Sequence, residues 1–387
     1  MYLYVLDNQL RRVALYDSYI SLIWTERYNE AGEFQLTTFM SRDAVNLFSL
    51  GVAVALSEST AVMFVRTQEV VDDDDSGVVL KITGVSMEAI LQDRYAIPSL
   101  EGSDTLDKWT LEGLPAAIAR QLFSDICVDL PFGPTDAIPF YTPGVAGPVG
   151  NIPEPSDPIP YEVSRGTLYE AIAKLCQIYH MGFRFVRPDD SSKVYFEIYM
   201  GSTRTTTQGL LPPVVFSRKL DTLGDISELR SLANHSNVAF VVGSEEVVTV
   251  YAEGVDETIS GFERKVLYVD ATDIDMPAGA ARTAALRQKG KEALAEHRPV
   301  IALDGEVPEN SGYKYNRDYF LGDIVEMTNS DGVSTNLRVT EQIFSSDVEG
   351  DKSFPTLTFD LLITPGSWLA WNALQVWDDA VGMWNDA

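Results

Sequence analysis

Cysteine and histidine are scarce in this sequence, and their scarcity excludes several kinds of site. The 387 residues include two cysteines and three histidines. Cys127 and Cys176 form no CxxC pair, and His180, His235 and His297 lie far apart, so no zinc-ligand spacing exists. We expect two buried thiols in a protein made in a reducing cytoplasm. A disulfide between the two cysteines is the alternative that the sequence leaves open. No metal or cofactor site is predicted.

Basic residues are also few. The sequence holds 29 Lys and Arg against 57 Asp and Glu, which gives a formal net charge of −28. DNA binding needs cations that replace the counterions of the phosphates, so a chain this acidic is not expected to bind DNA. Anionic lipid would be repelled in the same way. The charge suits a wall past which DNA slides without sticking.

Long apolar runs and catalytic signatures are missing as well. No basic stretch followed by an apolar one opens the chain, and no apolar run approaches the length of a membrane span, so we expect neither a signal peptide nor a transmembrane helix. GxSxG and HExxH are absent. Gly290-Lys291 comes nearest to a phosphate loop, but Ala285 and Glu292 stand where that loop needs Gly and Ser or Thr. The sequence therefore favours a protein that is not an enzyme.

Residues 1–95 consist of short apolar or alternating segments separated by Asn, Asp, Gly or Ser. This spacing is typical of the strands of a barrel or sandwich. The run Asp72–Asp75, closed by Gly77, predicts a hairpin tip. A solvated loop is favoured there over a calcium site, because the ligand spacing of an EF-hand is missing. We predict a first β-barrel over residues 1–95.

Residues 96–212 differ because two segments carry apolar residues at helical spacing. These are Leu111–Phe123 and Thr167–Tyr179, the second with Ser164 or Thr167 as its cap. Strand-like segments follow the second helix. We predict an α/β insertion domain over residues 96–212.

The strand pattern returns after residue 213 and is interrupted once by a helix. Ala281–His297 is rich in strong helix formers, and Pro299 ends it. We predict a second, split β-barrel from residues 213–243 and 300–365, with residues 244–299 inserted as a second α/β domain. The predicted fold class is α+β, mainly β, with two related β-barrels.

Residues 366–387 hold four of the six tryptophans. A helix would align one apolar stripe on a single side: Trp368, Trp371, Leu374, Trp377, Val381 and Trp384. We predict a C-terminal amphipathic helix that docks this stripe on another protein chain. The alternative left open is that the helix folds back on its own second barrel.

Two parts of the sequence resemble a known family, the baseplate or tail-tip hub proteins of siphophages. The first part is SLIWTERYNEAGEFQLTT at residues 21–38 with LKITGVSMEAIL from residue 80, and it matches at Trp24, Arg27, Gly32, Glu33, Phe34, Gly84, Ser86 and Leu91. The second part is the order of segments in the back half, and it matches at Asn237, Val238, Gly243, Asp270, Gly322, Asp323 and Arg338. Together they span most of residues 1–365.

The resemblance implies a fold of two related β-barrels with smaller α/β insertions, and a ring of three copies. Two similar barrels in each of three copies would present six similar faces, which adapts a sixfold tail tube to a threefold tip. The partners implied are further copies of the chain, the distal tail protein ring, the tape measure protein and other tail-tip proteins. DNA would pass only transiently through the channel that the hub forms or closes, in the tail tip of the virion.

Two other classes of function stay open. Many members of the hub family carry a C-terminal peptidase or lysin, but this sequence stops soon after its last predicted strand, so a lytic role is not carried over. A cell-wall hydrolase within the insertion is one alternative. A module that binds surface glycan is the other, suggested by 17 Tyr and 6 Trp, although aromatic residues in strands are more often core.

Overall fold

The computed structural model describes residues 1–73, 77–97, 109–130, 137–146, 150, 152, 158–163, 166–188, 191–252, 254–274, 276–308, 311–328 and 334–358. Within these residues the chain forms two compact units. Unit 1 combines Met1–Arg230 with Val300–Thr358, and unit 2 comprises Ser231–Pro299. The predicted C-terminal helix at 366–387 lies outside the described residues.

Unit 1 is built on one large sheet. Its main path runs β14-β18-β21-β20-β3-β4-β7-β6-β5-β1-β2, and β19 joins β20 at the side together with β12 and β13. The N-terminal strands are β1 (Leu3–Leu6), β2 (Arg12–Tyr16), β3 (Tyr19–Arg27), β4 (Glu33–Phe39), β5 (Ala53–Leu56), β6 (Val62–Asp73) and β7 (Gly77–Ser86). The later strands are β12 (Thr203–Arg204), β13 (Val215–Ser217), β14 (Gly224–Ser231), β18 (Val300–Glu306), β19 (Ile324–Thr328), β20 (Ser334–Asp347) and β21 (Gly350–Thr358).

The strands of residues 1–95 follow the predicted pattern. In β4, every second residue from Phe34 to Thr38 is buried, as expected of a strand with one face on a core. β6 and β7 form the predicted hairpin, whose last described pair is Asp73 with Gly77. The hairpin tip itself, residues 74–76, lies outside the described residues.

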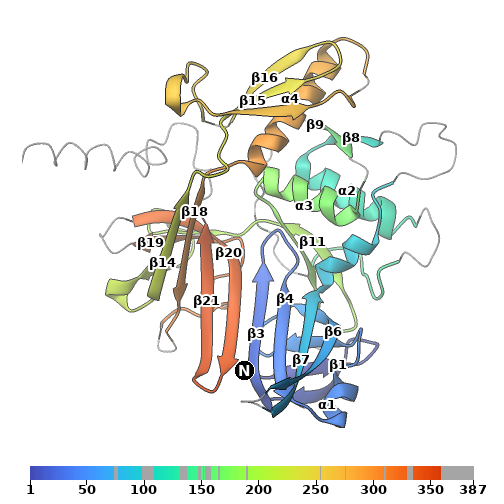
Figure 1. Ribbon diagram of the computed structural model, residues 1–387, viewed down its shortest axis with the longest axis vertical. Helices are drawn as coiled ribbons and strands as arrows, with labels where there is room; N and C mark the ends of the chain where they lie inside the picture. Colours follow the sequence, from blue (N-terminus) through green and yellow to red (C-terminus); the bar gives the residue numbers. More distant parts are fainter. Residues whose placement is uncertain are drawn as a thin grey trace, which may run out of the picture. The chain divides into compact units, whose positions relative to one another are not determined.

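The two predicted barrels are not seen as closed barrels in the described residues, and the pairing of β3 gives the reason. β3 bonds β4 along one edge. Its other edge, from Leu22 to Arg27, bonds β20 from Ser346 to Glu341. A strand has only two edges, and β4 and β20 occupy both edges of β3. β2 therefore cannot pair with β3 to close a barrel, and the path of the sheet ends at β2. Figure 1 shows β20 and β3 side by side, which joins the N-terminal and C-terminal halves of unit 1 in one sheet.

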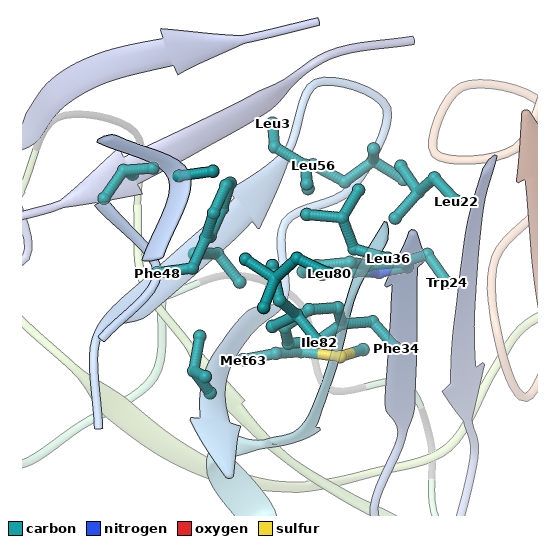
Figure 2. Packing of buried hydrophobic residues seen from close by; sticks show 14 of the residues in the cluster. Leu3, Leu22, Trp24, Phe34, Leu36, Phe48, Leu56, Met63, Leu80 and Ile82 are labelled. Carbon is teal, nitrogen blue, oxygen red and sulfur yellow. The ribbon is translucent and has the colours of Figure 1, made fainter. Parts of the chain in front are cut away.

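A hydrophobic core of unit 1 is formed largely by side chains of the N-terminal strands. Phe344 of β20 belongs to the same cluster, so the C-terminal half completes this core. Short helix α1 (Arg42–Leu47), capped by the Ser41 hydroxyl, contributes Ala44. Figure 2 shows ten of the large side chains packed together: Leu3, Leu22, Trp24, Phe34, Leu36, Phe48, Leu56, Met63, Leu80 and Ile82.

The insertion between β7 and β12 carries two helices. Its elements are the 3-10 helix η1 (Met87–Asp93), β8 (Trp109–Gly113), α2 (Pro115–Cys127), β9 (Ile159–Val163), α3 (Leu168–Ile178), β10 (Gly182–Val186) and β11 (Tyr195–Tyr199). The prediction began the first helix at Leu111, but Leu111 lies in β8, because Pro115 suits the first helical turn and Leu114 precedes it as N-cap. The second helix is confirmed, with a capping box between Thr167 and Glu170.

Unit 2 is a small α/β unit. Its sheet has the order β16-β15-β17, formed by β15 (Val238–Val242), β16 (Val247–Tyr251) and β17 (Val266–Asp270). Helix α4 (Ala280–Glu296) packs on it, in agreement with the predicted helix. Two further 3-10 helices among the described residues are η3 (Arg218–Leu220) of unit 1 and η4 (Gly261–Glu263) of unit 2. Because β15 pairs with β16 and β17, the structure places β15 in unit 2, whereas the sequence pattern placed it in the second barrel.

Gly290 shows that the nearest match to a phosphate loop is structural. It lies inside α4, where a Cβ would come within 2.7 Å of Cγ2 of Val241 and of Val250. The glycine therefore lets the helix approach the sheet closely. None of the helices in the described part of the chain is long and apolar enough to span a membrane.

Candidate functional site

The residues that carry the first part of the resemblance meet around the start of β4. The Trp24 and Phe34 rings stack with their centroids 5.7 Å apart. Gly84 lies against that pair, since a Cβ there would fall 2.2 Å from Cε1 of Phe34 and 2.3 Å from the Phe64 carbonyl oxygen. The Gly32 amide donates to the Ser86 hydroxyl at 2.8 Å. These residues therefore fix the contact between β3, β4 and β7.

Arg27 ties the same region to β20. Its Nε donates to Glu341 at 2.7 Å, and its Nη2 donates to Glu33 at 2.7 Å. The guanidinium is about one-quarter exposed, so the pairs are only partly screened by solvent. Arg27 thereby links three neighbouring strands, β4, β3 and β20.

The second part of the resemblance also has structural roles. The Asp323 carboxylate, which is buried, accepts from the Ser202 amide at 2.6 Å and from Nε of Arg204 at 2.7 Å. Arg338, equally buried, donates to the Gly322 carbonyl at 2.5 Å. Burial is the main cause that raises the pKa of Asp323. This cluster joins the end of the insertion to β19 and β20.

In unit 2, Asn237, which also belongs to the second part of the resemblance, has a structural role of the same kind. Its side-chain Nδ2 donates to the Glu263 backbone carbonyl at 2.7 Å, and its side-chain Oδ1 accepts from the Lys265 backbone amide at 2.8 Å. These two bonds hold the chain that enters β17 against the start of β15. Asn237 thus acts as a side-chain bridge between two segments.

A small polar cavity lies in unit 1 where the N-terminal sheet, the insertion and the segment near Tyr315 meet. Glu26 lines it and is buried. Its carboxylate accepts from Nε1 of Trp24 at 3.2 Å and from the hydroxyl of Tyr315 at 2.9 Å. Burial raises the pKa of Glu26 above its ordinary value, against the effect of these hydrogen bonds.

Glu88 and Arg184 also line the cavity. Glu88 accepts from the Phe185 amide at 2.7 Å, and burial raises its pKa as well. Arg184 donates twice to one oxygen of Glu197, at 2.9 and 2.8 Å, and stacks 4.1 Å from the Tyr199 ring centroid. The other Glu197 oxygen accepts from the Ala146 amide at 2.6 Å. Each charged group is thus held by a partner from another segment.

The size of this cavity limits its chemistry. Its volume is about 50 Å³, which has room for a few water molecules. Ligand pockets usually measure about 300–1,000 Å³. The buried carboxyl groups therefore serve to join three segments, and a sugar ring does not fit between them.

Glu26 was not among the predicted site residues, although the pattern of β3 carries a signal for it. Leu22, Trp24 and Glu26 alternate along β3, so a strand that buries the first two also buries the third. An acidic residue at such a position needs hydrogen-bond donors from elsewhere. Tyr315 supplies one from a distant part of the chain, which local patterns do not reveal.

The contacts and burial of the histidines and cysteines indicate structural roles. The His180 carbonyl accepts from the Tyr28 hydroxyl at 2.9 Å, and Nδ1 of His235 lies 3.2 Å from the His297 carbonyl. Burial lowers the pKa of His235. Cys127 and Cys176 are both buried thiols with no disulfide between them, and burial raises the pKa of Cys176. In the described ranges, no three His, Cys, Asp or Glu side chains gather as a metal site would require.

The six residues predicted to dock on a partner all lie outside the described residues. They are Trp368, Trp371, Leu374, Trp377, Val381 and Trp384. Their docking stays a prediction.

The described residues form an α+β, mainly β protein, in which buried polar residues such as Glu26 and Asp323 bond to distant segments. The chain belongs to the family described as Siphovirus ReqiPepy6 Gp37-like protein, which matches residues 2–356.

Two solved structures share the fold. The tail protein from Neisseria meningitidis MC58 is 14% identical, with a TM-score of 0.58 over 94% of this chain and 98% of that one. The 43 kDa tail protein of prophage MuSo2 from Shewanella oneidensis is 14% identical, with a TM-score of 0.54 over 92% of this chain and 98% of that one. No curated protein sequence matches significantly. At this identity the likeness concerns the fold alone.

Proposed function

We propose that this chain is a structural protein of the phage tail and forms the hub of the tail tip. The observation that carries the proposal is the fold, which two tail proteins, one of them from a prophage, share over nearly their whole length. Membership of a siphovirus family supports it. The buried carboxyl groups of Glu26 and Glu88 also support it, because they bond to other segments of the chain around a cavity of only about 50 Å³.

The hub would be a homotrimer between the distal tail protein ring and the tip. In each copy, the two halves of the unit 1 sheet on either side of the β3–β20 pairing would be the two related parts. Three copies would then offer six similar faces to a sixfold tube. The tape measure protein and other tail-tip proteins would be its further neighbours, in a virion assembled in the host cytoplasm.

The formal charge of −28 fits a channel through which DNA passes. Duplex DNA carries one negative charge per ~1.7 Å of its axis, so a basic wall would bind it and slow ejection. The acidic side chains are therefore expected to line the channel and the outer rim, with subunit contacts closer to neutral. Several rings of Lys or Arg facing the channel would contradict this arrangement.

A reconstruction of the tail tip from assembled virions tests the hub proposal. We expect three copies of this chain in one ring directly below the tube, with each subunit contact burying well over ~1,000 Å². Six copies, one copy, or a place elsewhere in the virion overturns the hub assignment.

The alternative of a cell-wall hydrolase needs its own test. A gel that contains peptidoglycan shows cleared bands where a hydrolase has renatured, and we expect none from this chain. Any clearing by this chain would replace the structural proposal, and clearing that persists in a Glu26→Gln/Glu88→Gln variant would place the site elsewhere. A glycan array with a reproducible hit would do the same in favour of receptor binding.

A further inference from the structure

One face of the unit 2 sheet is apolar and exposed. Helix α4 packs against the side chains of Ala239, Val241, Val248, Val250 and Val269. Side chains alternate along a strand, so the residues between these point to the opposite face. Four large apolar side chains on that face are 38–67% exposed: Phe240, Val247, Val266 and Tyr268. We call these four residues, with Val242 and Tyr251 beside them, the outer sheet face.

The strand register makes the outer sheet face continuous. Phe240 of the central strand lies between Thr249 of β16 and Tyr268 of β17. Val242 lies between Val247 of β16 and Asp270 of β17, so the apolar surface ends at Asp270 on that side. Thr249 is the polar residue within this surface, and contiguous apolar surface of this kind usually marks an interaction site.

A cation borders this face. The Arg264 guanidinium carbon lies 5.8 Å from the Phe240 ring centroid and 5.9 Å from the Tyr251 ring centroid. Its charge therefore lies over the aromatic part of the face. Asp270 lies on the same face beside Val242, at the end away from Tyr251. A partner that is apolar and places its acidic groups near Arg264, away from Asp270, therefore fits this surface.

The tryptophan segment, residues 367–385, has that chemistry. Residues 359–387 contain four Asp and no Lys or Arg. From Trp368 to Trp384 the stripe spans 17 residues, which equals the length of α4 on the other face of the sheet. As a helix it would be ~25 Å long. A helix on each face would bury both sides of the sheet, as α/β layers usually do.

The start of the segment limits what it can reach. Thr358, the last residue of β21, pairs with Ala302 of β18, and β18 begins at Val300 directly after unit 2. The nine residues between Thr358 and Trp368 span at most ~30 Å. The segment can therefore reach an outer sheet face only close to that point, on its own copy or on an adjacent one.

We propose that the outer sheet face of unit 2 is the docking surface for the tryptophan segment of a neighbouring copy of this chain. The choice of a neighbouring copy rests on the proposed trimer. A segment from one copy on the face of the next is a head-to-tail contact, and such contacts close into rings when the rotation between copies allows it. Tryptophan is among the residues most enriched at binding hot spots, so four of them provide the anchor.

The test uses three variants of the full chain. The face variant carries Phe240→Asp and Tyr268→Asp, and a second variant lacks residues 367–387. The matched control carries Phe39→Asp and Tyr95→Asp, one Phe and one Tyr that are 65% and 63% exposed in unit 1. Circular dichroism should show all three folded, because every substituted side chain is exposed.

Sedimentation and tryptophan fluorescence over a range of concentrations provide the readout. In the unchanged chain and the control, the mass should rise from one chain to three, and the emission maximum should move to shorter wavelengths as four of six tryptophans are buried. The face variant and the deletion variant should stay at the mass of one chain. Mixed together they should form a one-to-one complex, because one supplies the face and the other the segment.

Three results overturn the proposal. The first is a mass of one chain for the unchanged protein at every concentration. The second is an emission maximum that is already short in the single chain, which means that the segment docks on its own copy. The third is association that the face variant retains. None of them decides the hub proposal, since a tail-tip reconstruction with three copies and another contact would leave that standing.

Discussion

Removing the Tyr315 hydroxyl isolates the energetic role of the buried Glu26. In a Tyr315→Phe variant, the ring keeps its contacts with Tyr319 and Phe344, whose centroids lie 5.6 and 5.8 Å away. Only the hydrogen bond of 2.9 Å to the Glu26 carboxylate is lost. A hydrogen bond to a charged group is worth about 1.5–3 kcal/mol, and one to a neutral group about 0.5–1.5 kcal/mol. The cost of the substitution therefore depends on whether Glu26 is ionised.

The sign of the pH dependence follows from burial. Burial raises the pKa of Glu26 in the folded protein above its ordinary value near 4.3 in the unfolded chain. The stability that Glu26 contributes is then fully present below the unfolded pKa and is lost as pH rises through the folded pKa. Ionised Glu26 needs the Tyr315 hydroxyl more than protonated Glu26 does. Tyr315→Phe should therefore lower the free energy of unfolding more at pH 8 than at pH 5.

Urea unfolding of four proteins at both pH values measures this effect. They are the unchanged chain, Tyr315→Phe, Glu26→Gln and the double variant. Glu26→Gln should gain stability relative to the unchanged chain as pH rises, and Tyr315→Phe in that background should cost about 0.5–1.5 kcal/mol at either pH. Tyr313→Phe is the matched control, because its hydroxyl contacts backbone groups only. Equal costs of Tyr315→Phe at pH 5 and pH 8 in the unchanged background would refute the reasoning.

Three further predictions concern packing, a buried ion pair and assembly. Gly84→Ala should lower the free energy of unfolding by about 1–3 kcal/mol in urea unfolding, because its Cβ meets Phe34 and the Phe64 carbonyl, whereas Gly209→Ala, with open space around it, should change little. Arg204→Ala should cost about 3–5 kcal/mol in the same assay, since it leaves the buried Asp323 without its cation, and a further Asp323→Asn change should restore part of the loss. Deleting residues 367–387 should leave a folded subunit by circular dichroism that no longer enters assembled tails. An unfolded deletion variant would mean that this segment belongs to the core.

The strands and helices were largely predictable because their signals are local. Alternation gave the seven strands of residues 1–95, and Thr167, one of the two predicted caps, is the N-cap of α3. The first helix of the insertion was placed too early, since Leu111 fits a strand and a helix equally well over a short stretch.

The partners of the strands were not predictable in the same way. β15 has the same apolar pattern as the strands of unit 1, and only its pairing with β16 and β17 shows that it belongs to unit 2. The pairing of β3 with β20 depends on contact between residues that are distant in sequence, which no local pattern encodes. The buried carboxyl of Glu26 was visible in the alternation of β3, but its donor Tyr315 was not. The predicted docking residues lie outside the described part of the chain, so nothing yet tests them.

The pairing of β3 with β20 also has a consequence for synthesis. The register places Gln342 opposite Glu26, so one edge of β3 has no partner until the ribosome has made the stretch between them. At ~5–20 residues per second, that stretch takes about 15–60 s. An open edge with apolar neighbours is a template for wrong pairing with other chains. Expression that is slowed or stopped before β20 should therefore yield aggregated nascent chains, and chaperones that cover strand edges should raise the yield.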